Sequence, residues 1–110
     1  MKQALIKFST VGMHKWAAAP DHREYLRFPH RHNFFVEVTI QVWHNEREIE
    51  FHDLLQFCKD NFPQGEYKGA SCETLAEQLL EKLVTEYPER LVQVSVLEDN
   101  ENGAIVSNKE

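Results

Sequence analysis

The sequence has few of the residues on which small secreted or membrane-spanning proteins depend. It contains two cysteines, Cys58 and Cys72, both in segments with helical spacing, so neither their number nor their spacing indicates a disulfide framework. No apolar run is long enough to cross a bilayer, and the start MKQALIKF leads into alternating residues without the apolar core of a signal peptide. We therefore expect free thiols, no membrane partner and a cytoplasmic location.

Basic residues are also scarce. The chain has 12 Lys and Arg against 18 Asp and Glu, which gives a formal net charge of −6. General nucleic-acid binding needs a basic surface that displaces counterions, so we expect no nucleic-acid partner. The stretch 14–32 is the exception, because its basic residues outnumber its acidic ones; they are Lys15, Arg23, Arg27 and Arg31. Two interpretations stay open for it, a solvated loop or a site for a small anionic ligand.

The chain is long enough and apolar enough to bury a core. Of its 110 residues, 42% are hydrophobic, and no repeat, linker or low-complexity tract divides them, so residues 1–110 are expected to form one domain. Alternating apolar residues predict strands over 3–12 and about 32–44, which would pair antiparallel. Helical spacing predicts helices over 50 to about 61 and over about 71–87.

The last third of the chain returns to strand. LVQVSVLED carries alternating valines, the turn-like DNENG and a short AIVS complete a final hairpin, and GEYKGA is a connector between the helices. The order is thus two strands, two helices and two strands. It predicts an α+β fold in which a four-stranded antiparallel sheet (ββααββ) packs one face against a helix pair.

Two histidines begin the apolar face of the second predicted strand. Residues 30, 32 and 34 alternate onto one face, so His30 and His32 point the same way as the core residue Phe34. They lie about 7 Å apart along the strand, close enough for both rings to reach one ion. Such a pair is also typical of surface or hydrogen-bonded histidines, so it needs a third ligand to indicate a metal site.

His14 supplies that third ligand. It closes the first predicted strand on the same face as Phe8, and an antiparallel neighbour brings this end beside His30 and His32. Three protein ligands leave a fourth position for water or substrate, which is the pattern of catalytic rather than structural zinc. We therefore predict a zinc site formed by His14, His30 and His32.

Five segments, in this order and spacing, resemble those of the 6-pyruvoyltetrahydropterin synthase and 6-carboxytetrahydropterin synthase family of the T-fold superfamily. They are FSTVGMH (8–14), HRHNF (30–34), REIEFHDL (47–54), SCETLAEQLLEKL (71–83) and VSVLED (94–99). The resemblance covers nearly the whole chain. It implies a T-fold, zinc on the three histidines, and lyase chemistry on dihydroneopterin triphosphate or a related pterin or deazapurine precursor, as in queuosine biosynthesis.

The resemblance also implies how a ligand is held and how the chain assembles. Glu98 matches the family's glutamate that accepts hydrogen bonds from the N–H groups of a pterin, and Glu73 matches the glutamate of the second helix. A first-turn glutamate is equally explained by the helix dipole. T-fold domains form rings in which the sheets build a barrel, so we expect a homo-oligomer, which would also cover exposed sheet edges.

Three departures from the family pattern bear on catalysis. Leu26 stands where the family's enzymes carry a catalytic cysteine, Arg31 replaces the middle glycine of H-G-H, and no Asp-His pair occurs between the helices. Cys72, at a helix N-terminus that would lower its pKa, and His22 are the weak candidates for a substitute base. Two hypotheses follow: a synthase of this type, or a noncatalytic homologue that retains metal and pterin-like ligand binding as a regulatory or interaction module.

Overall fold

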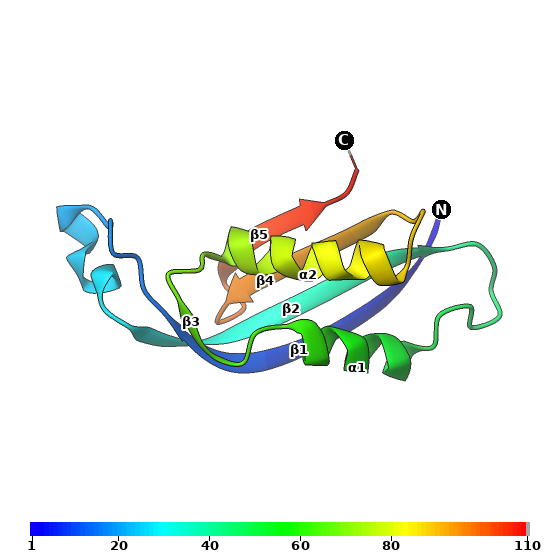
Figure 1. The fold of residues 1–110 in the computed structure, drawn as a ribbon, viewed down its shortest axis with the longest axis horizontal. Helices are drawn as coiled ribbons and strands as arrows, with labels where there is room; N and C mark the ends of the chain where they lie inside the picture. Colours follow the sequence, from blue (N-terminus) through cyan, green and yellow to red (C-terminus); the bar gives the residue numbers. More distant parts are fainter. Residues whose placement is uncertain (110) are drawn as a thin grey trace.

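The computed structural model describes residues 1–109, and its centre is a curved five-stranded sheet with two α-helices on one face (Figure 1). The elements in chain order are β1 (Lys2–His14), the 3-10 helix η1 (Asp21–Arg27), β2 (His30–Val42), α1 (Phe51–Asn61), β3 (Gly65–Lys68), α2 (Cys72–Glu86), β4 (Val92–Glu98) and β5 (Asn102–Ser107). The strand order is β3-β1-β2-β4-β5. The predicted α+β class is therefore confirmed.

The prediction of a four-stranded antiparallel sheet is wrong. GEYKGA is more than a connector, because it contains β3, which pairs in parallel with the end of β1, with Gly12 opposite Gly65. The other neighbouring strands are antiparallel, so the sheet is mixed. Four residues with a single buried side chain, Tyr67, are too short a run for alternation to reveal a strand. The tertiary contact of Tyr67 with the sheet, rather than a local pattern, explains this strand.

The long pair β1 and β2 fixes which residues share a face. Their antiparallel register places Phe8 opposite Val36, Gly12 opposite His32, and His14 opposite His30. Because side chains alternate along both strands, the even-numbered residues of both strands point to the helix-covered side. The predicted antiparallel pairing and the shared orientation of the three histidines are confirmed.

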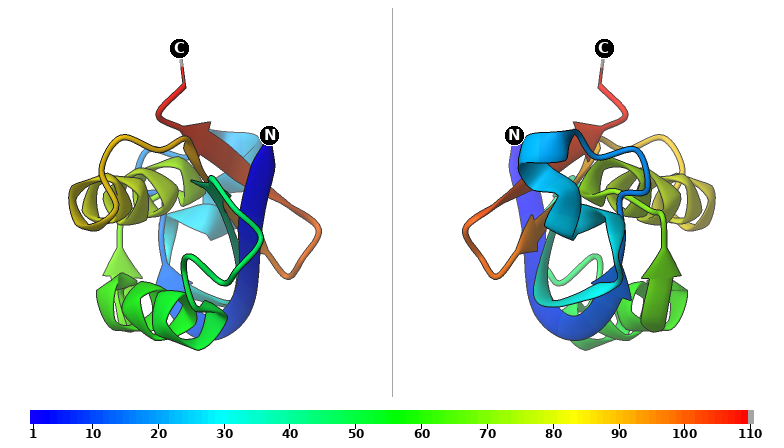
Figure 2. Two further views of the ribbon diagram at one scale, coloured as in Figure 1. Left: turned by 90° about the vertical axis from the view of Figure 1, so that its right-hand side faces the viewer. Right: turned by 90° about the vertical axis from the view of Figure 1, so that its left-hand side faces the viewer.

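Both α-helices begin at the expected residues. Side chains cap them: the Glu50 carboxylate accepts from the His52 N–H, and the Ser71 hydroxyl accepts from the Thr74 N–H at 3.1 Å. Both helices lie on the same side of the sheet, as the end-on views show (Figure 2). The fully buried residues of this layer include Leu54 and Cys58 of α1 and Leu75, Leu79 and Leu83 of α2.

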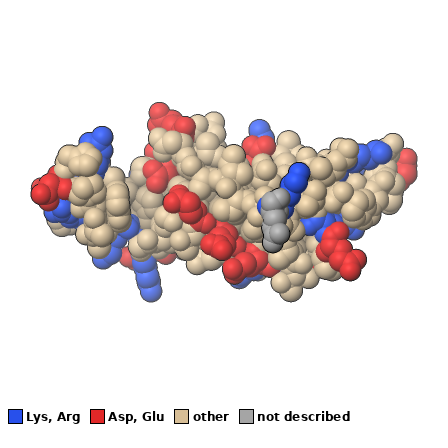
Figure 3. All heavy atoms as spheres, turned by 90° about the horizontal axis from the view of Figure 1, so that it is seen from above, with Lys and Arg blue, Asp and Glu red and all other residues tan. Residues whose placement is uncertain are grey.

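One end of the molecule is built differently from the helix-covered centre. The connection between β1 and β2, expected as a loop, contains η1, which stands beyond the sheet at the left of Figure 1. On the face seen in Figure 3, acidic side chains run across the middle, and basic ones lie among them and toward both ends. Among residues 1–109, no helix has the length and apolarity that a membrane crossing requires.

Candidate metal centre

Three histidines converge at the end of the sheet beside η1. His14 ends β1, while His30 and His32 begin β2, and one ring nitrogen from each lies within 4.8 Å of the other two. The ring centroids are 4.5 Å apart for His14 and His30, 5.3 Å for His14 and His32, and 5.0 Å for His30 and His32. The sheet register thus brings together the three residues predicted as metal ligands.

The Nδ1 atom of each histidine faces an oxygen that can only accept a hydrogen bond. The acceptors are the Ala70 carbonyl for His14 at 3.1 Å, the Phe28 carbonyl for His30 at 2.9 Å, and the Asp99 carboxylate for His32 at 2.7 Å. Each Nδ1 must therefore carry a proton, so in the neutral form of each ring the lone pair lies on Nε2. Metal-binding histidines are held in this way, with one ring nitrogen donating to an oxygen and the other free to ligate.

The Nε2 atoms lack the donors that would satisfy them. Among residues 1–109, the His32 Nε2 is buried without a hydrogen-bond partner, and the His14 Nε2 faces the Glu98 Oε1 at 3.2 Å. A buried polar atom without a partner is costly, and a cation is the partner that several converging lone pairs share. The donor set, three imidazole nitrogens beside a carboxylate, suits zinc and related divalent metals.

The protonation states of this cluster agree with metal binding. Burial lowers the pKa of His14, outweighing the Ala70 carbonyl and Glu98, which raise it, so the ring is neutral near pH 7. The hydrogen bond from His32 holds the pKa of Asp99 below its usual range. A neutral imidazole and an ionised carboxylate behind another imidazole are the forms that ligation requires.

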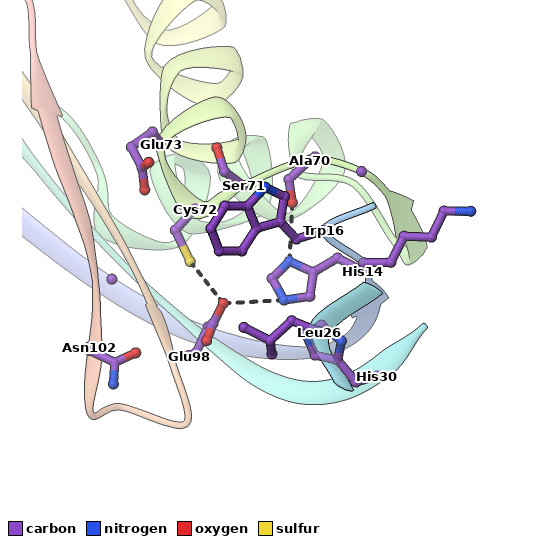
Figure 4. Close-up of a pocket in the computed structure, with 13 residues that line it drawn as sticks. His14, Trp16, Leu26, His30, Ala70, Ser71, Cys72, Glu73, Glu98 and Asn102 are labelled. Carbon is purple, nitrogen blue, oxygen red and sulfur yellow. Dashed lines mark hydrogen bonds and ion pairs between the residues drawn. The ribbon is translucent and has the colours of Figure 1, made fainter. Parts of the chain in front are cut away.

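A pocket of about 570 Å³ opens beside the histidines (Figure 4). His14 and His30 form part of its wall, and Trp16 and Leu26 come from the chain between β1 and β2. The connection before α2, the start of α2, the end of β4 and the start of β5 also line it. This volume lies within the range of small-molecule sites, and an aromatic wall with a few converging polar groups is typical of them.

The predicted ligand-binding and catalytic residues differ in where they lie. Glu98, Glu73 and Cys72 all line the pocket, with Glu73 exposed in the first turn of α2. His22 is exposed on η1 and is not among the lining residues. Leu26 does line the pocket, where its apolar side chain offers a surface contact and no ionisable group.

The Cys72 thiol is a poor base or nucleophile in this setting. Burial, and then the nearby charges of Glu98 and Glu73, raise its pKa to about 12. The expected lowering by the helix N-terminus is thus outweighed, because desolvation and two carboxylates both disfavour the thiolate. Its Sγ lies 3.8 Å from the Glu98 Oε1, to which the thiol donates weakly.

The basic stretch does not converge on the pocket. Of its four basic residues, only Lys15 lines it. Arg27 instead donates to the Asp21 carboxylate at 2.7 Å and to the Ala19 carbonyl at 2.8 Å, which holds the turn around η1 together. These contacts favour the structural interpretation of that arginine over an anion site.

Asp99 is the site residue that sequence reasoning missed. Its backbone φ of 53° lies in the left-handed region, and its carboxylate accepts from both the His32 ring and the Asn33 N–H, at 2.7 and 3.0 Å. In an extended strand, residue 99 would point away from the face that carries Glu98. The turn after β4 reverses this expectation, and only an acidic residue next to Glu98 in VLED hinted at it.

Comparison with known proteins identifies the fold and no family. No family model and no curated protein matches the chain. Among solved structures, the chain resembles the crystal structure of an uncharacterized protein from Wolinella succinogenes, with a TM-score of 0.75, 14% sequence identity and 98% of each chain covered. At this identity the likeness establishes a shared fold over the full length of both chains.

Proposed function

We propose that this protein binds zinc through His14, His30 and His32 and takes up a pterin or a related flat heterocycle in the adjoining pocket. The observation that carries the proposal is the convergence of three Nε2 lone pairs, each fixed by a hydrogen bond on the opposite side of its ring. The protein would then be a short, divergent relative of the 6-pyruvoyl and 6-carboxytetrahydropterin synthases. The sequence resemblance and the pocket both support this assignment.

The chain supplies distinct groups for each part of such a ligand. A zinc ion held by three histidines acts as a Lewis acid toward oxygen atoms of a bound molecule. Trp16 offers an apolar surface in the pocket wall, and Glu98 offers two carboxylate oxygens that accept from paired ring N–H groups. Glu73 stands at the exposed rim, where the helix dipole already explains its presence.

Turnover would need a catalytic base in addition to the metal and the ligand-binding residues. Lyase chemistry on dihydroneopterin triphosphate needs a base within hydrogen-bond reach, and such groups supply about 10²- to 10⁴-fold in rate. Leu26 cannot ionise, and the Cys72 pKa of about 12 leaves that thiol protonated. We therefore favour binding with slow or absent turnover, a module that retains metal and ligand recognition, over an active synthase.

Assembly into a homo-oligomer belongs to the same proposal. In the single chain, the edge strands of the sheet are β3 and β5, and an unpaired edge invites pairing with another copy. A ring of sheets, as in T-fold proteins, would cover these edges. Light scattering at micromolar concentration should report a mass of several chains, and a mass of 12.9 kDa would contradict this assembly.

Ligand binding is tested with neopterin, whose fluorescence reports its environment. Zinc-loaded protein should bind neopterin, and Glu98→Gln should weaken this binding while circular dichroism stays unchanged, because one charged acceptor is lost. Glu101→Gln, a substitution at an exposed residue, is the matched control. Equal affinities for wild type and Glu98→Gln would remove Glu98 as the anchor, and no binding at all would remove the heterocycle from the proposal.

Turnover is tested on the same preparation with dihydroneopterin triphosphate, by following triphosphate release. We expect a rate far below the roughly 1 s⁻¹ at which ordinary enzymes begin. A rate at or above that value would favour the synthase alternative. Cys72→Ser and His22→Ala would then identify any substitute base.

A further inference from the structure

The Glu98 carboxylate lies close to the histidines as well as lining the pocket. It ends β4, and its Oε1 is 3.2 Å from the His14 Nε2 (Figure 4). Its Oε2 is 3.7 Å from the His32 Nε2. The sheet sets this position, because Glu98 pairs with Phe34 of β2, two residues beyond His32. The side chain therefore points along the same face as the histidines.

In the neutral tautomers that the surroundings favour, no hydrogen atom joins these groups. The Nδ1 protons of His14 and His32 are donated to Ala70 and Asp99, so a neutral ring presents its Nε2 lone pair to Glu98. An ionised carboxylate presents only lone pairs as well. Acceptors facing each other at 3.2 Å repel unless a proton or a metal cation lies between them, and a metal cation there would be bound by all of them.

The spacing also matches a metal coordination sphere. Zinc binds nitrogen and carboxylate oxygen at about 2.0–2.2 Å in a tetrahedron, so two neighbouring ligand atoms are about 3.3 Å apart. The 3.2 Å between the Glu98 Oε1 and the His14 Nε2 is such a separation, while the 3.7 Å between the Glu98 Oε2 and the His32 Nε2 is longer.

We propose that Glu98 is the fourth ligand of the metal when no heterocycle is present, which closes the three-histidine site into a His₃Glu centre. This inference rests on the proposed metal binding and goes beyond it. It assigns the two adjacent carboxylates opposite sides of His32. Asp99 holds the Nδ1 side and orients the ring, while Glu98 lies toward the Nε2 side and binds the ion.

A shared carboxylate has a consequence for ligand uptake. The Glu98 oxygens cannot bind the metal and receive the N–H groups of a heterocycle at the same time in the same geometry. Ligand binding must then move Glu98 from the metal to the ligand and open the fourth position to the incoming molecule. The partial exposure of the Glu98 side chain, 28%, leaves room for this movement.

Cobalt(II) is the probe, because its visible absorption reports the number and type of its ligands. The full chain is titrated with cobalt as wild type, Glu98→Gln, Glu98→Asp and the control Glu101→Gln. We expect Glu98→Gln to lower cobalt affinity by about 10- to 100-fold, the size of effect that even outer-shell partners of metal ligands have, and to change the spectrum. Glu98→Asp keeps the charge but retracts the carboxylate by one methylene, so it should also weaken binding.

The outcomes separate this inference from the proposed function. If wild type binds cobalt and His32→Ala does not, while both Glu98 variants bind within about twofold of wild type and keep its spectrum, Glu98 is not a ligand and the inference is overturned. A Glu98→Asp variant with wild-type affinity and spectrum would likewise show that charge alone matters. If wild type itself takes up no cobalt, the proposed metal binding fails as well. Neopterin should shift the wild-type cobalt spectrum and leave that of Glu98→Gln nearly unchanged, and the reverse would refute the exchange of Glu98.

Discussion

The helix-covered face of the sheet contains two regions, one that lies under the α-helices and one that lies beyond them. Along β1, β2 and β4, the residues under α1 and α2 are fully apolar, as with Val36, Val38 and Val94. Beyond the helices the same alternation continues, but the side chains become His14 and His30. Strand periodicity therefore sets the face to which a side chain points. Coverage by a helix decides whether that face belongs to the hydrophobic core or to the candidate site.

The two regions meet at an aromatic layer. The Phe34 ring centroid lies 5.3 Å from that of His14, 5.8 Å from that of His32 and 4.9 Å from that of Tyr67. Edge-to-face contacts of this kind favour fixed ring positions. The aromatic residues of the core therefore pack directly against the imidazole rings. Substitutions in the core and in the site show whether the two can be perturbed separately.

The largest effect on stability is expected in the covered region. Leu79→Ala removes a fully buried side chain between α2 and the sheet, which should lower the free energy of unfolding by about 2–5 kcal/mol, measured by urea denaturation. The zinc content of the folded variant should stay at the wild-type value, because Leu79 touches none of the histidines' hydrogen bonds. Loss of zinc from a folded Leu79→Ala protein would contradict the view that core stability and zinc binding are independent.

Gly12→Ala tests the packing at the boundary between the hydrophobic core and the histidine site. A Cβ at this position would overlap the Tyr67 ring, whose room to shift is limited by the neighbouring rings of Phe34 and Phe62. We expect a loss of about 1–3 kcal/mol in unfolding free energy, as for other overpacked sites. Gly69→Ala is the control, since the nearest atom to its added Cβ is 3.9 Å away. Equal effects of the two substitutions would contradict the tight packing of Tyr67.

Asp99→Asn should act on the site while leaving the core intact. Asparagine tolerates the left-handed backbone that Asp99 adopts, so the turn is kept while the charge behind His32 is lost. We expect zinc affinity to fall by about 10-fold, in competition with a chelating dye, and urea unfolding of the metal-free protein to change by less than about 0.5 kcal/mol. Asp60→Asn, on α1, is the control, and equal zinc affinities for the two variants would mean that Asp99 does not orient His32.

The smallest effect is expected at the cysteines. Burial raises the pKa of both Cys58 and Cys72 to about 12, so almost no thiolate exists at pH 8. A thiol reagent should therefore leave the folded protein unmodified over hours and label both cysteines once urea unfolds it. Rapid labelling of Cys72 in the folded protein would restore it as a candidate nucleophile.

The periodicity of apolar residues predicts most of the fold from the sequence. The two α-helices, the four longer strands and the shared face of the three histidines follow from spacing and caps, as with Ser71 at the start of α2. β3 was missed because a four-residue strand has no period to read. Its pairing depends on Tyr67 packing over Gly12, a contact distant in sequence.

The finer features of the site depend on tertiary structure that no local pattern contains. The turn at Asp99 brings a second carboxylate to His32, and the register of β4 brings Glu98 to the Nε2 side of the same ring. The burial that raises the Cys72 pKa is likewise created by the packing of α2 against the sheet. Sequence reasoning located these residues near the site or overlooked them, but could not assign their partners.

The most direct test is a count of bound zinc. Full-length protein is loaded with zinc, freed of excess by gel filtration and measured by mass spectrometry of the metal, as wild type, His30→Ala, His32→Ala and the control His52→Ala, whose side chain is exposed on α1. The account predicts about one zinc per chain for wild type and His52→Ala, and loss of most of it in the other two variants, because removing one histidine ligand breaks the site. A wild type that takes up no zinc at neutral pH, or a His32→Ala variant that retains as much as wild type, would contradict it.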